Sequence, residues 1–234
     1  MLKQTSTVYM QPVRYVQVST AFPFQSDEAI AAHMAQWRES PEGKGVLGRA
    51  RTQELASVDV SAALAVARSI DHPWYRCQAL SSIAEVNPAH PQAERWLIEA
   101  LDAAYSQSEP NRVALVSSWP LRVLVRRNAS VASVNVERLL GVISQESHGL
   151  RRLHGLHAIV IAAAPEPGLR ERAWEPFFKA AGECAGWRTE RIVDVVASVL
   201  ADYDVGRAKL LLESRPPTRF TRSTRARLSM SPAG

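Results

Sequence analysis

The chain has 234 residues, of which 46% are hydrophobic and 7% aromatic, and its formal net charge is +5. This composition can fill one large or two small domains with an aliphatic, alanine-rich core, which favours packed helices over sheets. No apolar run reaches the roughly 18–20 residues of a membrane helix, and the N-terminus lacks the apolar region of a signal peptide. We therefore expect a cytoplasmic protein without membrane contact.

The positive charge lies at the C-terminal end. Residues 215–234 contain five arginines and no acidic residue, whereas residues 1–214 contain 23 basic and 23 acidic side chains. The body of the chain is therefore neutral and gives no general indication of nucleic-acid binding.

Three predicted elements occupy residues 1–56, which we assign to an N-terminal arm. Residues 8–18 include β-formers but also Pro12, which favours an extended arm over a central strand. Residues 26–39 are amphipathic and begin with acidic side chains, so they predict a helix. Residues 40–48 are glycine-rich and predict a flexible linker.

The predicted linker contains a run that matches the pattern G-x-G-x-x-G, Gly43-Lys44-Gly45-Val46-Leu47-Gly48. This fingerprint binds dinucleotides only where a strand feeds the turn and a helix follows it. Here a charged helical segment and a proline precede the run. We interpret the run as part of a linker and expect no cofactor.

Residues 57–84 nearly repeat as residues 133–160, without a gap. We call the offset between these two segments the repeat spacing. Nine of the 28 aligned positions are identical, including His72 and His148. Internal repeats at this scale are typical of stacked helical units, which usually serve as binding surfaces. We therefore predict a mainly α fold, with an α-solenoid of about four helical hairpins over residues 57–214.

Arginines recur in one column of the four predicted units. They are Arg76, Arg112, Arg152 and Arg188, at nearly even intervals. One apolar residue follows four positions after each arginine and another follows seven positions after it, which places all three on one helical face. These apolar residues are Leu80, Val116, Leu156 and Ile192 at the first offset, and Ile83, Trp119, Ile159 and Val195 at the second.

Each unit is predicted to contain two antiparallel helices. In the first unit, Asp59 or Ser57 caps one helix and a second helix covers about residues 74–86, where prolines end it. A short closing helix through Leu212 is expected to end the array. Residues 215–234 are rich in Arg, Pro, Ser and Thr, and we expect them to form a disordered basic tail.

The stretch AVARSIDHPWYRCQALSSIA, residues 65–84, resembles the helical-hairpin repeats of bacterial proteins in the tetratricopeptide/HEAT-like class. The resemblance is clearest in the first unit and covers residues 57–212 at most. It implies an α-solenoid used for protein–protein contacts, sometimes as the sensor part of a larger signalling protein. It carries over no catalytic residue.

The arginine column has two interpretations. It is either a packing ladder that ties each helix to its neighbour, or a row of guanidinium groups that lines a groove for an acidic or phosphorylated ligand. Asp71 and Glu183 each precede an arginine by five residues and are candidate partners. Because a feature present in every unit usually serves packing, we expect Arg112 and Arg152 to be substantially buried.

Other candidate sites are weaker. His148, His154 and His157 form a local cluster in which two histidines share a helical face, as zinc ligands can. Adjacent arginines would repel a dication, so we interpret these as surface or packing histidines and expect no metal. No nucleophile motif is present, and Asp202 and Asp204 are typical of a helix end, so we expect no enzymatic activity.

We expect the two cysteines to be free thiols. Cys77 and Cys184 fall in the first and fourth predicted units. Three helical layers of roughly 8–10 Å each would separate them, well beyond the reach of a disulfide.

The expected function is a non-enzymatic protein–protein interaction module whose helical-repeat groove binds another protein. The alternative is a nucleic-acid-associated helical-repeat protein that uses the arginine column and the basic tail, in which Phe220 is the one aromatic residue. A third option is an enzyme whose residues are dispersed along the chain. A neutral apolar groove would favour the first function, and a continuous basic stripe the second.

Overall fold

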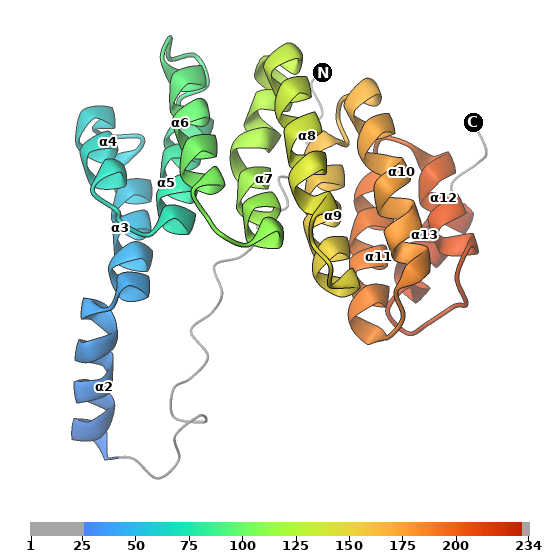
Figure 1. Ribbon diagram of the computed structural model, residues 1–234, viewed down its shortest axis with the longest axis horizontal. Helices are drawn as coiled ribbons and strands as arrows, with labels where there is room; N and C mark the ends of the chain where they lie inside the picture. The colour runs from blue at the N-terminus through green and yellow to red at the C-terminus, as the bar shows by residue number, and fades with distance from the viewer. Residues whose placement is uncertain (1–25, 231–234) are drawn as a thin grey trace. The chain divides into compact units, whose positions relative to one another are not determined.

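The computed structural model describes residues 26–230, and within them the chain forms twelve helices and no strand (Figure 1). The protein is therefore mainly α-helical, as predicted. The chain divides into two compact units, Met1–Ser40 and Pro41–Gly234. The extended arm predicted over residues 8–18 lies outside the described residues.

The first unit contains helix α2 (Asp27–Glu39), where the sequence predicted one. Ser26 is its N-cap, and the Ser26 hydroxyl accepts a hydrogen bond from the backbone N–H of Ala29. Asp27 and Glu28 follow in the first turn, where carboxylates interact favourably with the helix dipole. The helix predicted over residues 26–39 is confirmed, with Ser26 as its cap.

The second unit contains all the other described helices. They are α3 (Pro41–Leu55), α4 (Val60–Arg68), α5 (Pro73–Val86), α6 (Ala93–Tyr105), α7 (Pro110–Arg127), α8 (Ala129–Ser144), α9 (Gly149–Ala163), α10 (Pro167–Glu183), α11 (Trp187–Leu200), α12 (Val205–Glu213) and α13 (Arg222–Met230). The predicted helix over residues 74–86 corresponds to α5, and the predicted closing helix through Leu212 corresponds to α12.

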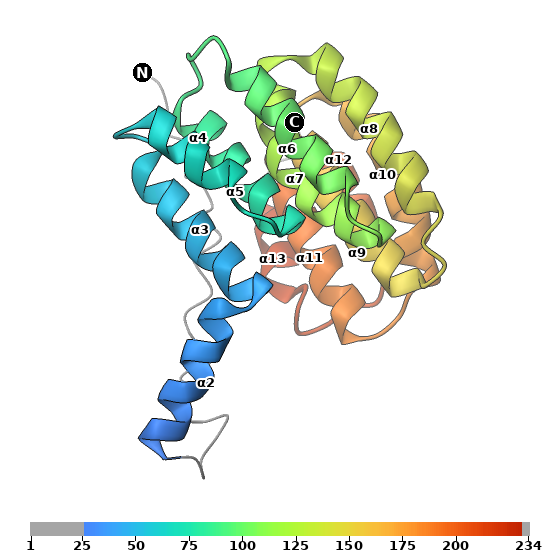
Figure 2. The ribbon, with the colours of Figure 1, turned by 60° about the vertical axis from the view of Figure 1, so that its left-hand side comes forward.

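These helices pack in two rows. In the first row α3, α5, α7, α9 and α11 each contact the next (Figure 1). The second row consists of α4, α6, α8, α10 and α12, each of which contacts one or more helices of the first row. Within the second row α8 and α10 are in contact and lie side by side in Figure 2. The two rows enclose a continuous aliphatic core that is rich in alanine.

Most helices begin at a residue that suits a helix N-terminus. Side chains of Asp59, Asn128, His148, Glu166 and Asp204 accept hydrogen bonds from backbone N–H groups of the first turn. Proline occupies the first position of α5, α7 and α10, where its missing N–H is not needed. Local sequence therefore sets the start of these helices, and burial of their apolar faces stabilises them.

Helix bounds recur at the repeat spacing found in the sequence. The starts of α5 and α9, Pro73 and Gly149, differ by this spacing, and so do the starts of α8 and α12. The last residues of α4 and α8, Arg68 and Ser144, differ by it as well. The repeating structural unit is therefore two hairpins long.

One polar contact occurs twice at the repeat spacing. The Asn128 side chain, at the N-cap of α8, donates to the Glu94 carboxylate of α6 at 3.1 Å. At the equivalent positions, Asp204 at the N-cap of α12 lies 3.5 Å from the Arg170 guanidinium of α10. Burial tends to raise the Asp204 pKa, but hydrogen bonds from Arg207 and the charges of both arginines lower it overall. Asp204 is a structural helix cap, as the sequence indicated.

The glycine-rich linker predicted over residues 40–48 is wrong, because this segment opens helix α3. A Cβ on Gly45 would lie 2.9 Å from Cγ of Tyr75, and one on Gly48 would lie 2.8 Å from Cγ1 of Ile70. These glycines therefore allow close approach of the residues around α5, and tertiary packing offsets their low helix propensity.

This helix also corrects the predicted domain boundaries. The predicted boundary separates an arm of residues 1–56 from a repeat domain of residues 57–214. This boundary falls within the second unit, which begins at Pro41. Helix α3 contacts both α4 and α5. Residues 41–56 therefore belong to the helical array, because their glycines pack against it.

Gly155 of α9 makes a similar close contact, and we expect Gly155→Ala to destabilise the protein by roughly 1–3 kcal/mol. A Cβ there would lie 2.8 Å from Cγ1 of Ile143 and 3.1 Å from the Ala114 Cβ. Gly141 is the matched control, because a Cβ on this residue of α8 would meet nothing within 4 Å. Gly141→Ala should stabilise by roughly 0.5–1 kcal/mol. Urea unfolding of both variants measures the difference, and a stabilising Gly155→Ala would contradict the packing.

Pro120 lies inside α7, where its missing N–H leaves the Val116 carbonyl without its usual helical donor. The buried Cys77 thiol of α5 faces this carbonyl, with its sulfur 3.4 Å from the oxygen. A weak S–H donor therefore satisfies the acceptor that the proline leaves open.

Both cysteines are free, as predicted, and we expect only one to react with a thiol reagent in the folded protein. Cys77 is fully buried, and burial raises the pKa of its thiol, so little thiolate is available. Cys184 is half-buried. A colorimetric disulfide reagent should titrate one thiol per chain in buffer and two in denaturant. Rapid reaction of two thiols in buffer would contradict the burial of Cys77.

Candidate binding site at the C-terminal end

An open hollow of about 560 Å³ lies where the α10–α11 connection faces the segment between α12 and α13. We call it the C-terminal hollow. Its aromatic lining residues are Trp187, the first residue of α11, and Phe220 of the segment between α12 and α13. Gly186, the N-cap of α11, has a φ of 101°, so the chain enters α11 in a conformation that favours glycine.

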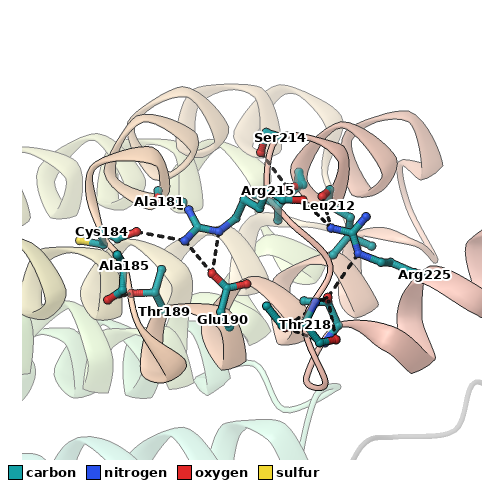
Figure 3. A network of polar contacts seen from close by, with 12 residues as sticks. Ala181, Cys184, Ala185, Thr189, Glu190, Leu212, Ser214, Arg215, Thr218 and Arg225 are labelled. Carbon is teal, nitrogen blue, oxygen red and sulfur yellow. Dashed lines mark hydrogen bonds and ion pairs between the residues drawn. The ribbon is translucent and has the colours of Figure 1, made fainter.

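A buried ion pair between Glu190 and Arg215 holds the two walls of the hollow together (Figure 3). The Arg215 Nε and Nη2 donate to the same Glu190 oxygen, Oε1, at 3.0 and 2.7 Å. Only 12% of the Arg215 side chain and 11% of the Glu190 side chain are exposed. Arg215 also donates to the carbonyls of Ala181 and Cys184 at the end of α10, where a cation interacts favourably with the helix dipole.

A second arginine fixes the chain between α12 and α13. Arg225 donates to the carbonyls of Leu212 and Arg215 and to the Thr221 hydroxyl (Figure 3). Two further contacts join α13 to α11. Thr224 donates to Asp194 at 2.6 Å, and Arg227 donates to the Ser198 carbonyl at 2.9 Å.

These contacts correct the disordered basic tail predicted for residues 215–234. Residues 222–230 form helix α13, which contacts α11 and α12 and buries Leu228. Arg215, Arg225 and Arg227 bond to acceptors of the same chain, because several backbone carbonyls at helix ends need donors. Residues 231–234 lie outside the described part of the chain.

Three other arginines lie over the aromatic rings of the hollow. The guanidinium carbons of Arg188 and Arg191 are 5.2 and 5.9 Å from the centre of the Trp187 ring. That of Arg219 is 4.8 Å from the centre of the Phe220 ring. Among the described residues, no carboxylate lies within ion-pair distance of these three groups. The rim of the hollow is therefore positively charged.

The predicted arginine column is placed in the first turn of four first-row helices. Arg76, Arg112, Arg152 and Arg188 belong to α5, α7, α9 and α11. The apolar residues four positions later are all buried. Seven positions later the pattern fails, because Trp119 is half-buried and Val195 is 46% exposed. Arg76 is the fourth residue of its helix but Arg112 is the third, so the second unit is out of the predicted register.

The expected burial of the column is wrong for Arg112. Its side chain is 54% exposed and has a carboxylate only at 3.9 Å, that of Glu109 before its own helix. Arg152 is 29% exposed and pairs with Glu183 of α10 at 3.0 Å. Glu183 was a candidate partner for Arg188, but it pairs instead with Arg152 of the preceding unit.

Arg76 and Arg188 differ again. Arg76 lines a smaller hollow of about 270 Å³ beside the Arg68–Glu99 ion pair, whereas Arg188 is exposed on the Trp187 ring. Asp71, the other candidate partner, is exposed. The column therefore has no single structural role.

A ladder of ion pairs between successive units does exist, but other arginines form most of it. These pairs are Arg68–Glu99, Arg122–Glu85, Arg151–Glu109, Arg172–Glu137 and Arg207–Glu171. At least one side chain of each pair is exposed. Each pair therefore contributes at most about 1 kcal/mol, and the ladder orients neighbours more than it stabilises them.

The histidine cluster separates into a cap and a stacked pair. His148 is the N-cap of α9 and accepts from the Arg151 N–H. The rings of His154 and His157 stack with centroids 5.0 Å apart and an 8° angle between their planes. The described part of the chain contains no group of three or more His, Cys, Asp or Glu side chains that could hold a metal ion.

We expect the stacked pair to make folding sensitive to acid. Burial lowers the pKa of His157 from 6.5 to about 4. The hydrogen bond to the His154 carbonyl acts in the opposite direction but does not offset the burial. The unfolded chain therefore binds the proton first, and stability falls as the pH drops from about 6.5 to about 4, by up to roughly 3 kcal/mol. His157→Gln should lose less stability over this interval in urea unfolding. Equal losses in both proteins would contradict the assignment.

The sequence analysis did not single out Trp187, which lines the hollow, or Arg191 on the adjoining face of α11. Trp187, Arg191 and Val195 recur at steps of four along α11 and therefore share a face. This spacing was the available signal. The partnership of Glu190 with Arg215, far along the chain, had no local signal.

No protein-family model matches this chain, and no curated protein and no solved structure is significantly similar to it. Among the described residues, no helix is both long enough and apolar enough to cross a membrane.

Proposed function

We propose that the second unit is an α-solenoid that serves as a non-enzymatic protein–protein interaction module. The alternation of first-row and second-row helices and the recurrence of helix bounds at the repeat spacing support the solenoid. The proposal also agrees with the resemblance of residues 65–84 to tetratricopeptide/HEAT-like hairpins.

The exposed face of α11 carries the proposal. Trp187 is 53% exposed and Val195 is 46% exposed, with the exposed Arg191 between them on the same face. Aromatic residues and arginine are enriched where proteins bind one another. Covering large exposed apolar side chains with a partner also lowers the free energy of the complex. This face adjoins the C-terminal hollow through Trp187.

Nucleic-acid association remains the second candidate, and one observation favours it. Helices α7 and α9 contain six arginines and no acidic residue. Against it, three of the five tail arginines bond to acceptors of the same chain, which leaves fewer donors for phosphates than the sequence suggested. We therefore favour a protein partner.

Site-specific photo-crosslinking tests the proposed function. A benzophenone amino acid is placed at Val195 of α11 and, as a control, at Val134 of α8, which is also exposed. In nuclease-treated native lysate, we expect a discrete protein adduct from position 195 that Trp187→Ala removes, and none from position 134. Equal adducts from both positions, or none from position 195, would contradict the proposal.

A further inference from the structure

We infer that the C-terminal hollow binds an acidic peptide segment of the partner protein, with an apolar side chain of that segment seated in the hollow. This inference rests on the proposed function and names the chemistry of the partner. It is carried by three observations: the lining of the hollow, its positively charged rim, and the neutral charge of the rest of the chain.

The lining fits one large apolar side chain. A volume of about 560 Å³ lies within the range of sites that bind small molecules and side chains. Trp187 and Phe220 provide aromatic surface, and Pro216 and Ala185 add apolar surface around them. An anchor residue that fills a desolvated pocket is the usual source of affinity in a small protein interface.

The rim selects negative charge. Arg188, Arg191 and Arg219 lie over the two rings and have no carboxylate partner among the described residues. A guanidinium that covers an aromatic face keeps its edge N–H groups available, and these match a carboxylate in a bidentate geometry. The carboxylate in the lining, Glu190, is already paired with Arg215 and does not neutralise the rim.

The distribution of charge favours a peptide over a nucleic acid. The positive charge of the rim is local, because residues 1–214 carry equal numbers of basic and acidic side chains and offer a long polyanion no net attraction. A short acidic segment needs only the rim arginines, whereas the binding of a long polyanion depends on positive charge along its whole length.

Fluorescence anisotropy with the full chain tests the inference. The probe is a fluorescein-labelled heptapeptide with a central tryptophan and three glutamates on each side. We expect it to bind, to weaken as salt is raised, and to lose about tenfold or more in affinity in Arg191→Ala. The matched control is Arg126→Ala, which removes an exposed arginine from the end of α7. It should leave the affinity within about twofold.

Two further probes decide the class of ligand. A heptapeptide with lysines in place of the glutamates should bind at least tenfold more weakly. A labelled thymidine oligonucleotide of equal charge should also bind more weakly than the acidic peptide. Equal binding by the lysine peptide, tighter binding by the oligonucleotide, or equal effects of Arg191→Ala and Arg126→Ala would overturn the inference.

The crosslinking experiment separates this inference from the function on which it rests. If the adduct at position 195 persists in an Arg188→Ala, Arg191→Ala double variant, the chain binds a protein but not through acidic side chains. In that case the inference fails and the proposed function stands. If wild-type protein gives no adduct, the proposed function itself fails.

Discussion

Replacing Arg215 with alanine is expected to lower the free energy of unfolding by roughly 3–5 kcal/mol, because the substitution leaves Glu190 buried without its cation. The Glu190 and Arg215 side chains are both nearly nine-tenths buried, and one Glu190 oxygen receives both of the Arg215 hydrogen bonds to this carboxylate. The variant also removes the donors to the last carbonyls of α10. Urea or thermal unfolding, followed by circular dichroism, measures the loss.

Two variants define what the Arg215 result means. Arg68→Ala removes an arginine from an exposed pair with Glu99 and should cost about 1 kcal/mol or less. Combining Arg215→Met with Glu190→Leu removes both charges and should recover much of the lost stability. If Arg215→Ala lost no more unfolding free energy than Arg68→Ala, the Glu190–Arg215 ion pair would have to be exposed to solvent. The wall of the hollow that contains this pair would then be exposed as well.

Leu80→Ala and Leu156→Ala are each expected to destabilise the protein by roughly 2–5 kcal/mol. These leucines occupy equivalent positions of α5 and α9, related by the repeat spacing, and both are buried in the core. Truncation removes apolar contacts and leaves a cavity that closely packed helices fill only in part.

The exposed Leu210 of α12 is the control for the core leucines. Leu210→Ala should change the unfolding free energy by about 0.5 kcal/mol or less in the same denaturation assay. Should either core variant behave like this control, the repeat would not bury its equivalent faces in the same way.

Local signals predicted much of the helical order. Of the two predicted caps, Asp59 and Ser57, the structure confirms Asp59 at the start of α4, because capping depends on neighbours within one turn. The long repeat was visible in the sequence because two-hairpin units with equivalent neighbours need similar residues at similar positions. The alignment of the four arginines between successive hairpins was less reliable. Helix α7 starts one residue later than it would if Arg112 occupied the same helical position as Arg76.

What the sequence did not reveal depends on contacts between distant segments. Gly45 is tolerated in α3 because the Tyr75 ring packs against it. From composition alone, the same glycine predicted a flexible linker. The composition of the C-terminal segment predicted disorder. Its arginines are instead ordered by backbone carbonyls, such as that of Ala181, and the pattern of side chains in a sequence does not show where such carbonyls will lie. The site was missed for the same reason, since Trp187 and Phe220 line one hollow only after the chain has folded.

The central claim is that residues 214–230 fold onto α11 and complete the C-terminal hollow. Hydrogen–deuterium exchange of the full chain, read by mass spectrometry, tests it most directly. We predict that peptides from α13 exchange much more slowly than an unstructured chain, and that Arg215→Ala removes this protection while α5 and α7 stay protected. Exchange of α13 at the rate of an unstructured chain in the wild-type protein would contradict the claim, because the hollow would then lack the wall that carries Phe220.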